Sequence, residues 1–267
     1  MKIAVFTVML PDLTPEEAAT ALRDTGYDGV EWRVATGDDH PCTFRPDEAE
    51  RARALTEQVG LGVPNIGTYI ALGDMKKVEA SLAFARGVGS PHFRIGFHNF
   101  KGNYHEHVKA ARSFIRDISG LTKGSGVKPL IELHHGSIVP SASLAHRLVA
   151  EFDPDEVGII HDAGNMVHEG FEKYLMGLEL LGPYLAHVHL KNAAFDRPEG
   201  GGVWRARWSP LEDGVVDFAA LFSALKAVGY DGWISLEDFS EARPSREALQ
   251  HNLDFVRAAL GQERTRA

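Results

Sequence analysis

Ionisable residues end four consecutive apolar segments in the C-terminal half of this chain. These ends read Glu132-Leu133-His134, His161-Asp162, His187-Val188-His189-Leu190-Lys191 and Glu237-Asp238. A carboxylate at the end of a buried strand is unfavourable unless a cation neutralises it. Successive side chains of a strand point to opposite faces, so only alternate residues of each segment can share a face. We expect Glu132, Asp162, His189 and Glu237 to point to one common site.

Three carboxylates and one imidazole at one site favour a bound cation, because the carboxylates alone would repel one another. This oxygen-rich set suits Mn²⁺, Co²⁺ or Mg²⁺ better than it suits a structural zinc. The sequence predicts one divalent metal per chain, with Mn²⁺ preferred and Co²⁺, Mg²⁺ and Zn²⁺ as alternatives. The other interpretation is that a neighbouring Lys or Arg forms a salt bridge with each carboxylate.

The elements that must position these residues follow a repeated pattern of short apolar runs and amphipathic segments. The eight runs cover residues 2–8, 29–34, 63–69, 92–97, 128–134, 157–164, 185–191 and 232–239. Their length and their content of Val, Ile and Phe are typical of strands. Thr14-Pro15-Glu16-Glu17 is a capping box, which predicts a helix start. A glycine that can end a helix precedes five of the strands, at Gly26, Gly60, Gly89, Gly126 and Gly229.

Alternating strands and helices imply parallel strands with right-handed crossovers. Eight such units in 267 residues predict an α/β fold, a closed (β/α)8 TIM barrel that forms a single domain over residues 1–267. A doubly wound open sheet would bring a Gly-rich turn after its first strand, and residues 6–17, "FTVMLPDLTPEE", contain none. In such a barrel the chemistry lies at the C-terminal ends of the strands, where the ionisable residues fall.

Composition excludes several classes of function. The net charge of −9 argues against a nucleic-acid or acidic-membrane partner, which would need a basic face. No apolar run reaches the roughly 18 residues of a membrane span. The opening "MKIAVFTVML" predicts a first strand rather than a secretion signal. The single cysteine, Cys42, excludes an internal disulfide and indicates a cytoplasmic protein; we interpret it as an incidental residue rather than a nucleophile.

Five motifs resemble the xylose isomerase-like TIM barrel superfamily, also described as sugar phosphate isomerases/epimerases. They are "GYDGVEWR", "IELHHG", "HDAGNMVHEG", "HVHLKN" and "DGWISLEDF", and the resemblance covers nearly the whole chain. It implies that Glu132, Asp162, His189 and Glu237 hold one divalent metal. The chain departs from the ketose 3-epimerases at Asn165, where those enzymes usually carry His, although His168 follows.

The resemblance implies a metal-dependent sugar isomerase or epimerase. The metal would stabilise an enediolate after a proton is removed next to a carbonyl, and Glu132 and Glu237 would transfer the proton. The alternative is a metal-dependent lyase or dehydratase that acts on a keto-sugar, a keto-inositol or a 3-keto C-glycoside. Two further classes are weaker. The net charge disfavours an apurinic endonuclease, and a non-catalytic sugar-binding protein would not need all four ligands. The expected partner is a small carbohydrate, and relatives often form dimers or tetramers.

Candidate substrate contacts surround the predicted metal site. They are His134, Arg94, Asn165, His168 and Lys191, with Glu31 at the end of the second strand and Trp204 and Arg205 in the segment 192–214. We expect this segment to face the substrate, because Trp204 and Trp208 are unfavourable in solvent. His161 and His135 fall on the opposite strand faces and are interpreted as packing or hydrogen-bonding residues. The "EGGGV" segment (199–203) follows no strand directly, so no phosphate-binding loop is predicted.

Overall fold

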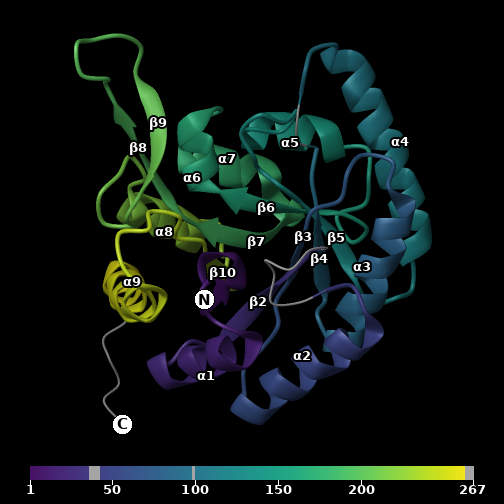
Figure 1. Ribbon diagram of the computed structural model, residues 1–267. Helices are drawn as coiled ribbons and strands as arrows, with labels where there is room; N and C mark the ends of the chain where they lie inside the picture. The colour runs from purple at the N-terminus through teal and green to yellow at the C-terminus, as the bar shows by residue number, and fades with distance from the viewer. Residues whose placement is uncertain (36–42, 98–99, 262–267) are drawn as a thin grey trace.

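Eight parallel strands close into a barrel in the computed structural model, which describes residues 1–35, 43–97 and 100–261. Around the barrel the strand order is β1-β10-β7-β6-β5-β4-β3-β2, and the helices between successive strands surround it (Figure 1). The predicted (β/α)8 TIM barrel is therefore confirmed. Cys42 lies outside the described residues.

The bounds of the elements agree with the repeated pattern of the sequence. The barrel strands are β1 (Lys2–Phe6), β2 (Gly29–Val34), β3 (Ile66–Thr68), β4 (His92–Ile95), β5 (Lys128–Glu132), β6 (Gly158–Asp162), β7 (Leu185–Leu190) and β10 (Trp233–Leu236). The helices are η1 (Thr7–Met9), α1 (Pro15–Thr25), α2 (Pro46–Val59), α3 (Met75–Val88), α4 (Tyr104–Thr122), α5 (Ala142–Val149), α6 (Ala163–His168), α7 (Tyr174–Leu181), η2 (Gly182–Tyr184), α8 (Phe218–Ala227) and α9 (Ser245–Leu260). Each barrel strand lies within one of the eight predicted runs.

Most of the predicted local signals mark the ends of helices. The Thr14 amide donates a hydrogen bond to Glu17 Oε2 (2.9 Å), and the Glu17 amide donates to Thr14 Oγ1 (3.3 Å), which completes the capping box of α1. Gly26 follows α1 with a φ of 98°, a conformation that only glycine adopts readily. Gly60 and Gly89 cap α2 and α3 in the same conformation, and Gly229 directly follows the C-cap of α8. Gly126 also has a positive φ, but α4 ends before it, at Thr122.

Most of the segment 192–214, which is expected to face the substrate, forms an antiparallel hairpin. Strands β8 (Asn192–Asp196) and β9 (Arg205–Ser209) pair from Asn192–Ser209 to Asp196–Arg205, and the hairpin projects away from the barrel (Figure 1). Asn192 fastens its base: Nδ2 donates to the Leu211 carbonyl (2.8 Å), and Oδ1 accepts from the Val216 amide (2.9 Å). The hairpin is thus an ordered addition to the barrel.

The strands divide apolar from polar side chains between their two faces. Trp32, Ile131 and Val188 point outward and belong to the apolar core beneath the helices. Their neighbours Glu31 and Glu132 point into the barrel and are also fully buried. The interior of the barrel therefore carries the polar groups from which a site can be built. Among the described residues, no helix combines the length and the apolar character needed to cross a bilayer.

His92, the first residue of β4, makes the stability of the fold pH-dependent. Burial lowers the pKa of His92 to about 4, and nearby His187 adds to the effect. The folded chain therefore keeps this ring neutral between its usual pKa of about 6.5 and pH 4, whereas the unfolded chain takes up a proton. Stability should accordingly fall as the pH drops through this window, by about 2 kcal/mol at about pH 5.

Urea unfolding of the wild-type protein and of His92→Gln at about pH 7 and about pH 5 measures this contribution. The variant should lose less free energy of unfolding than the wild type between the two pH values. Equal losses would show that His92 does not carry the effect.

Candidate active site

Glu132, Asp162, His189 and Glu237 meet inside the barrel, at the C-terminal ends of β5, β6, β7 and β10. One ligand atom from each lies within 4.8 Å of all the others. Measured from Nδ1 of His189, the distances are 3.0 Å to Glu132 Oε1, 3.8 Å to Asp162 Oδ2 and 3.4 Å to Glu237 Oε2. The four side chains are at most 2% exposed. The structure therefore brings together the four residues that the strand alternation selects.

The geometry of Asp162 fits a cation ligand. Its Oδ1 accepts a hydrogen bond from the Asn165 amide (2.8 Å) and caps α6, which aims Oδ2 into the cluster. This Oδ2 is buried, and the polar group nearest to it outside the cluster is the Lys191 ammonium, at 2.9 Å. Three buried carboxylates and an imidazole that converge in this way form the donor set that a divalent ion such as Mn²⁺, Mg²⁺, Co²⁺ or Zn²⁺ would use. These four residues would hold such an ion.

Two basic side chains lie against the same carboxylates. The Lys191 ammonium contacts Glu237 Oε2, and its Nζ lies 2.9 Å from Asp162 Oδ2 and 3.7 Å from Glu132 Oε1. Arg94 Nη1 donates to Glu132 Oε2 at 2.7 Å. The interpretation that basic neighbours pair with the carboxylates thus describes part of the site. A divalent ion and the ammonium would compete for the same oxygens.

These charges control the ionisation of the cluster. Burial alone would raise the pKa of Glu132, but Arg94 and Lys191 outweigh it and hold that pKa well below its usual value. Burial raises the pKa of Asp162 to about 7, against the charge of Lys191 and with the help of Glu132 and Glu237. Burial would lower the pKa of His189, yet the surrounding carboxylates raise it well above its usual value. Binding of a metal at Nδ1 would therefore release a proton from His189.

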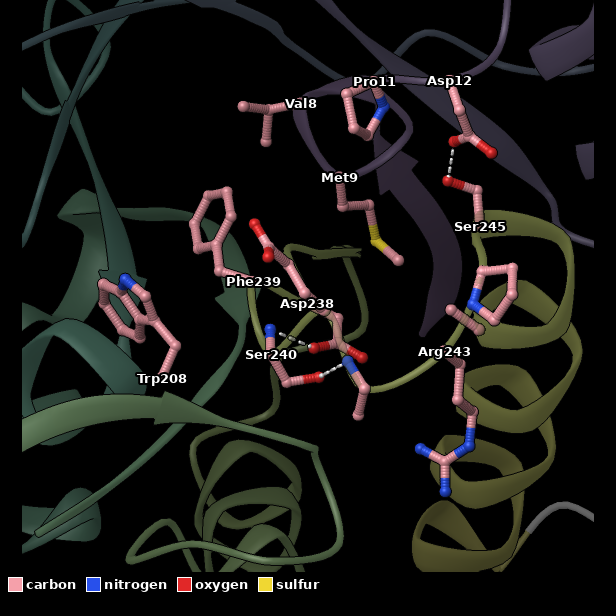
Figure 2. Close-up of a pocket in the computed structure, with 14 residues that line it drawn as sticks. Val8, Met9, Pro11, Asp12, Trp208, Asp238, Phe239, Ser240, Arg243 and Ser245 are labelled. Carbon is pink, nitrogen blue, oxygen red and sulfur yellow. Dashed lines mark hydrogen bonds between the residues drawn. The ribbon is translucent and has the colours of Figure 1, made fainter. Parts of the chain in front are cut away.

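Aromatic rings cover the cluster on the solvent side. Trp208, from β9, and Phe239, just after β10, pack with their ring centroids 5.6 Å apart (Figure 2). Lys191 Nζ lies 5.4 Å from the ring of Trp208 and 5.2 Å from that of Phe239. Phe239 was not among the predicted site residues, although its place two positions after Glu237 put it on the same face. The covering rings exclude water from the charged groups.

A stack of imidazoles extends this cover toward β5 and α6. The ring centroids are 4.4 Å apart between His134 and His135, 4.5 Å between His135 and His168, and 4.4 Å between His168 and Trp208. His135, interpreted from its strand parity as a hydrogen-bonding residue, pairs its Nδ1 with Asn165 Oδ1 at 3.0 Å. His134 and His168 thus lie at the mouth of the site.

Of the remaining predicted substrate contacts, some lie in the site and others lie outside it. Arg94 lies in the site, and among the described residues its buried Nη2 has no hydrogen-bond partner, so it can donate to a substrate. Trp204 precedes β9 on the projecting hairpin and is 59% exposed, and Arg205 beside it is exposed too. Within the described part of the chain, neither residue contacts the four candidate ligands. Of the two tryptophans expected to face the substrate, only Trp208 lies at the site.

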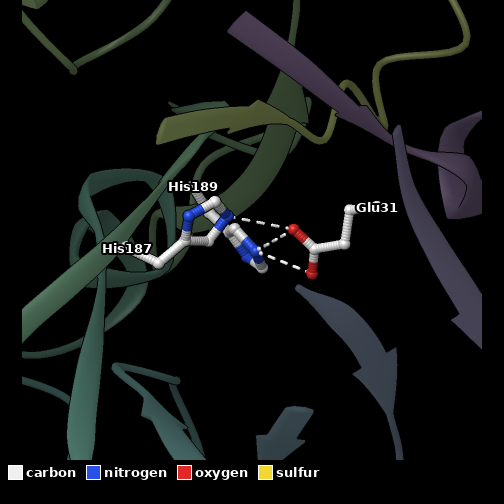
Figure 3. Close-up of side chains that lie close together, drawn as sticks. All are labelled: Glu31, His187 and His189. Atoms are coloured by element: carbon white, nitrogen blue, oxygen red, sulfur yellow. Dashed lines mark hydrogen bonds and ion pairs between the residues drawn. The ribbon is translucent and has the colours of Figure 1, made fainter. Parts of the chain in front are cut away.

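Glu31 lies one layer deeper than the sequence suggested, because it is the third residue of β2 rather than the end of the strand. Figure 3 shows its carboxylate facing the rings of His187 and His189. His189 Nε2 lies 3.2 Å from both carboxylate oxygens, and His187 Nε2 lies 3.0 Å from Oε2. Asn65 Nδ2 donates to Oε1 at 2.8 Å. Glu31 therefore holds the Nε2 edge of His189 and turns Nδ1 toward the cluster.

The fold and the site define a TIM barrel with a candidate metal centre at the C-terminal ends of its strands. The model of the xylose isomerase-like TIM barrel family matches residues 19–259, and the chain belongs to this family.

Known proteins similar to this chain include enzymes of two reaction types. The inosose dehydratase of Geobacillus thermodenitrificans (strain NG80-2) is 29% identical over 158 residues, which are 54% of this chain and 52% of that protein. The chain spans about half the length of the curated relatives it matches. The 3-keto-D-glucoside 4-epimerase YcjR from E. coli superposes with a TM-score of 0.75 at 20% identity, over 97% of this chain and 99% of that chain. The IolI protein with a bound zinc atom has a TM-score of 0.79 at 17% identity, over the full length of both chains. At such identities the two structures support the fold.

The contact between Glu31 and His189 predicts the effect of Glu31→Gln on metal binding. Gln keeps the shape of the side chain but removes the charge that makes the imidazole a stronger ligand, so the affinity for Mn²⁺ should fall about 10- to 100-fold. Calorimetric titration of the metal-free protein with Mn²⁺ measures this change.

Two control variants accompany the calorimetric titration. Asp162→Ala removes a candidate ligand and should abolish stoichiometric binding of the ion. Ser235→Ala removes only the hydrogen bond to His187 Nε2 (2.9 Å) and should leave the affinity within about twofold of the wild type. Unchanged affinity in Glu31→Gln would mean that Glu31 is a packing residue, and full occupancy in Asp162→Ala would reject the metal site.

Proposed function

We propose that this protein is a divalent-metal-dependent dehydratase that acts on a keto-sugar or a keto-inositol. The observation that carries the proposal is the position of the Lys191 ammonium, which lies between Glu237 and Asp162 at the candidate metal site. Dehydration next to a carbonyl needs a base for the α-proton and an acid for the leaving hydroxyl, and an adjacent carboxylate and ammonium provide both. The similarity to inosose dehydratases supports the same reaction type.

Glu237 is the better base of the two candidate carboxylates. Glu132 Oε2 accepts a hydrogen bond from Arg94 at 2.7 Å, whereas Glu237 Oε1 lies 4.0 Å from the same guanidinium. Burial would raise the pKa of Glu237, but Lys191 and His189 hold it below its usual value. Lys191 gives up its proton in this mechanism, whereas the guanidinium of Arg94 stays charged and keeps Glu132 ionised. In this mechanism Glu237 removes the α-proton, while Glu132 fixes the position of Arg94.

Lys191 would act as the acid. Its ammonium donates a proton to the hydroxyl on the β-carbon as the carbon–oxygen bond breaks, and the carbon–carbon double bond forms with loss of water. The proton held by Glu237 can then return to Lys191, because the two groups are in contact. Proton transfer therefore balances without a further reactant.

Other residues of the site would bind and shield the substrate. When bound, a divalent ion would supply Lewis-acid polarisation of the substrate carbonyl. Arg94 Nη2 is available to donate to a substrate oxygen, and His134 lies at the mouth of the site. Trp208 and Phe239 exclude water above Lys191, which strengthens the electrostatic interactions beneath them.

The second candidate function is an isomerase or epimerase, which the resemblance to the family implied. One observation favours it: Glu132 on β5 and Glu237 at the end of β10 are separated around the barrel by β6 and β7, so they flank the site. One carboxylate could remove a proton from one face of a sugar and the other could return it to the opposite face.

Incubation of the Mn²⁺-loaded protein in D₂O separates the two reactions. The substrates are 2-keto-myo-inositol, a panel of ketoses and aldoses, and 3-keto-glucose, and the products are followed by NMR and mass spectrometry. A dehydratase should release one water per turnover and form an unsaturated or diketo product. Conservation of the substrate formula with deuterium at the reacting carbon would overturn the dehydratase proposal in favour of the epimerase.

Substitution of Lys191 tests its role as an acid. Lys191→Met should lower turnover by about 10²- to 10⁴-fold, the usual contribution of a positioned proton donor, and should raise the Mn²⁺ affinity because no ammonium competes for the carboxylates. Lys191→Arg keeps the charge, but its guanidinium does not release a proton, so it should be equally slow without the gain in affinity. If Lys191→Arg retains full turnover, Lys191 only balances charge.

A further inference from the structure

A cavity of about 650 Å³ opens beside the candidate active site. It lies between the segment that follows β1, the segment from β10 to α9, and the ring of Trp208 (Figure 2). Glu132, Asp162, His189 and Glu237 are not among its lining residues. Its volume is in the range of about 300–1,000 Å³ that holds drug-sized ligands. A sugar bound at the four candidate ligands would therefore leave this cavity unfilled.

The cavity presents a largely apolar surface. Val8, Met9 and Pro11 line it from the N-terminal segment, and Phe239 and Ala248 line it from the C-terminal segment. Figure 2 shows the side chains of Met9 and Phe239 around the same open space. Such a surface gains free energy when it buries an apolar group.

The charged residues around the cavity disfavour an anionic ligand. Asp12, Asp238 and Glu241 line it, against the single basic residue Arg243. The guanidinium of Arg243 already donates to Glu212 Oε1 at 2.7 Å. A phosphate in this cavity would meet three carboxylates and one cation that is already paired, so an uncharged group fits better.

The cavity and the active site share a wall. Trp208 and Phe239 line the cavity, and both rings lie over the Lys191 ammonium. Asp238, another lining residue, directly follows Glu237 in the chain. A molecule that reacts beside Lys191 is therefore separated from the cavity by these two rings alone.

We propose that the cavity binds an uncharged aromatic or aliphatic substituent of the sugar. Among the substrates of the proposed reaction, the cavity then favours a keto-sugar that carries an apolar group over a free sugar, a free inositol or a sugar phosphate. This inference rests on the proposed function, because it assigns the reacting part of the same substrate to the site beneath Lys191. Trp208 and Phe239 contact both parts of the substrate.

Binding of simple probes to the Mn²⁺-loaded protein tests the cavity without any turnover. The probes are D-glucose, phenyl D-glucopyranoside in both anomeric forms, and D-glucose 6-phosphate, measured by calorimetry or by competition in NMR. One phenyl glucoside should bind about 10- to 100-fold more tightly than glucose, as expected for burial of a phenyl ring. The phosphate should bind no more tightly than glucose.

Two variants locate the phenyl group. Ala242→Trp at the exposed rim and Ala248→Phe on α9 should reduce the ratio of phenyl glucoside affinity to glucose affinity toward one. Ala258→Trp, on the exposed face of the same helix, is the matched control and should keep the ratio. The ratio compares two ligands on one preparation, so partial misfolding of a variant does not imitate the effect.

The outcomes for the cavity and for the reaction are distinguishable. Equal affinities for glucose and both phenyl glucosides, preferential binding of the phosphate, or an unchanged ratio in both cavity variants would overturn the cavity proposal, even if the protein dehydrates keto-sugars. Phenyl binding that the two variants abolish would support the cavity, even if no dehydration is found and the proposed reaction is wrong.

Discussion

The burial of several carboxylates inside one barrel is the constraint on which the rest of the site depends. Transfer of an ionised carboxylate from water into a protein interior costs several kcal/mol unless opposite charge and hydrogen bonds compensate it. Glu132, Asp162 and Glu237 meet where almost no solvent reaches them, and Arg94, Lys191 and His189 supply the compensating charge. The protein thus provides its own cations in the space where a divalent ion would bind.

The same constraint explains why the barrel interior is polar over more than one layer. His189 faces carboxylates on both edges of its ring, and Glu31 on the deeper side is in turn held by Asn65 and His187. Both ring nitrogens of His189 are thus held by carboxylates, so the imidazole has little freedom to rotate. An apolar interior could not have fixed this ring in the same way.

Much of this arrangement could be predicted from the sequence, because the signals were local. The period of two along the strands selected Glu132, Asp162, His189 and Glu237, and the capping box and helix-exit glycines marked helix ends. The individual pairings between side chains of different strands could not be predicted. Parity placed Lys191 on the face of His189. That its ammonium lies between Asp162 and Glu237 depends on β6 and β10, the strands on either side of β7. The different positions of Trp204 and Trp208 depend on where the hairpin begins to pair. The depth of Glu31 depends on where β2 pairs with its neighbours.

The hairpin β8–β9 gives the protein a part whose evolutionary history can differ from that of the barrel. Trp208, the ring that covers the candidate active site, comes from this addition and not from a barrel strand. Changes in the length or composition of the hairpin alter the cover over Lys191 while the strands that carry the charged cluster stay intact. Gene duplication followed by sequence change in this hairpin could therefore give proteins that keep the same reactive groups but act on different substrates.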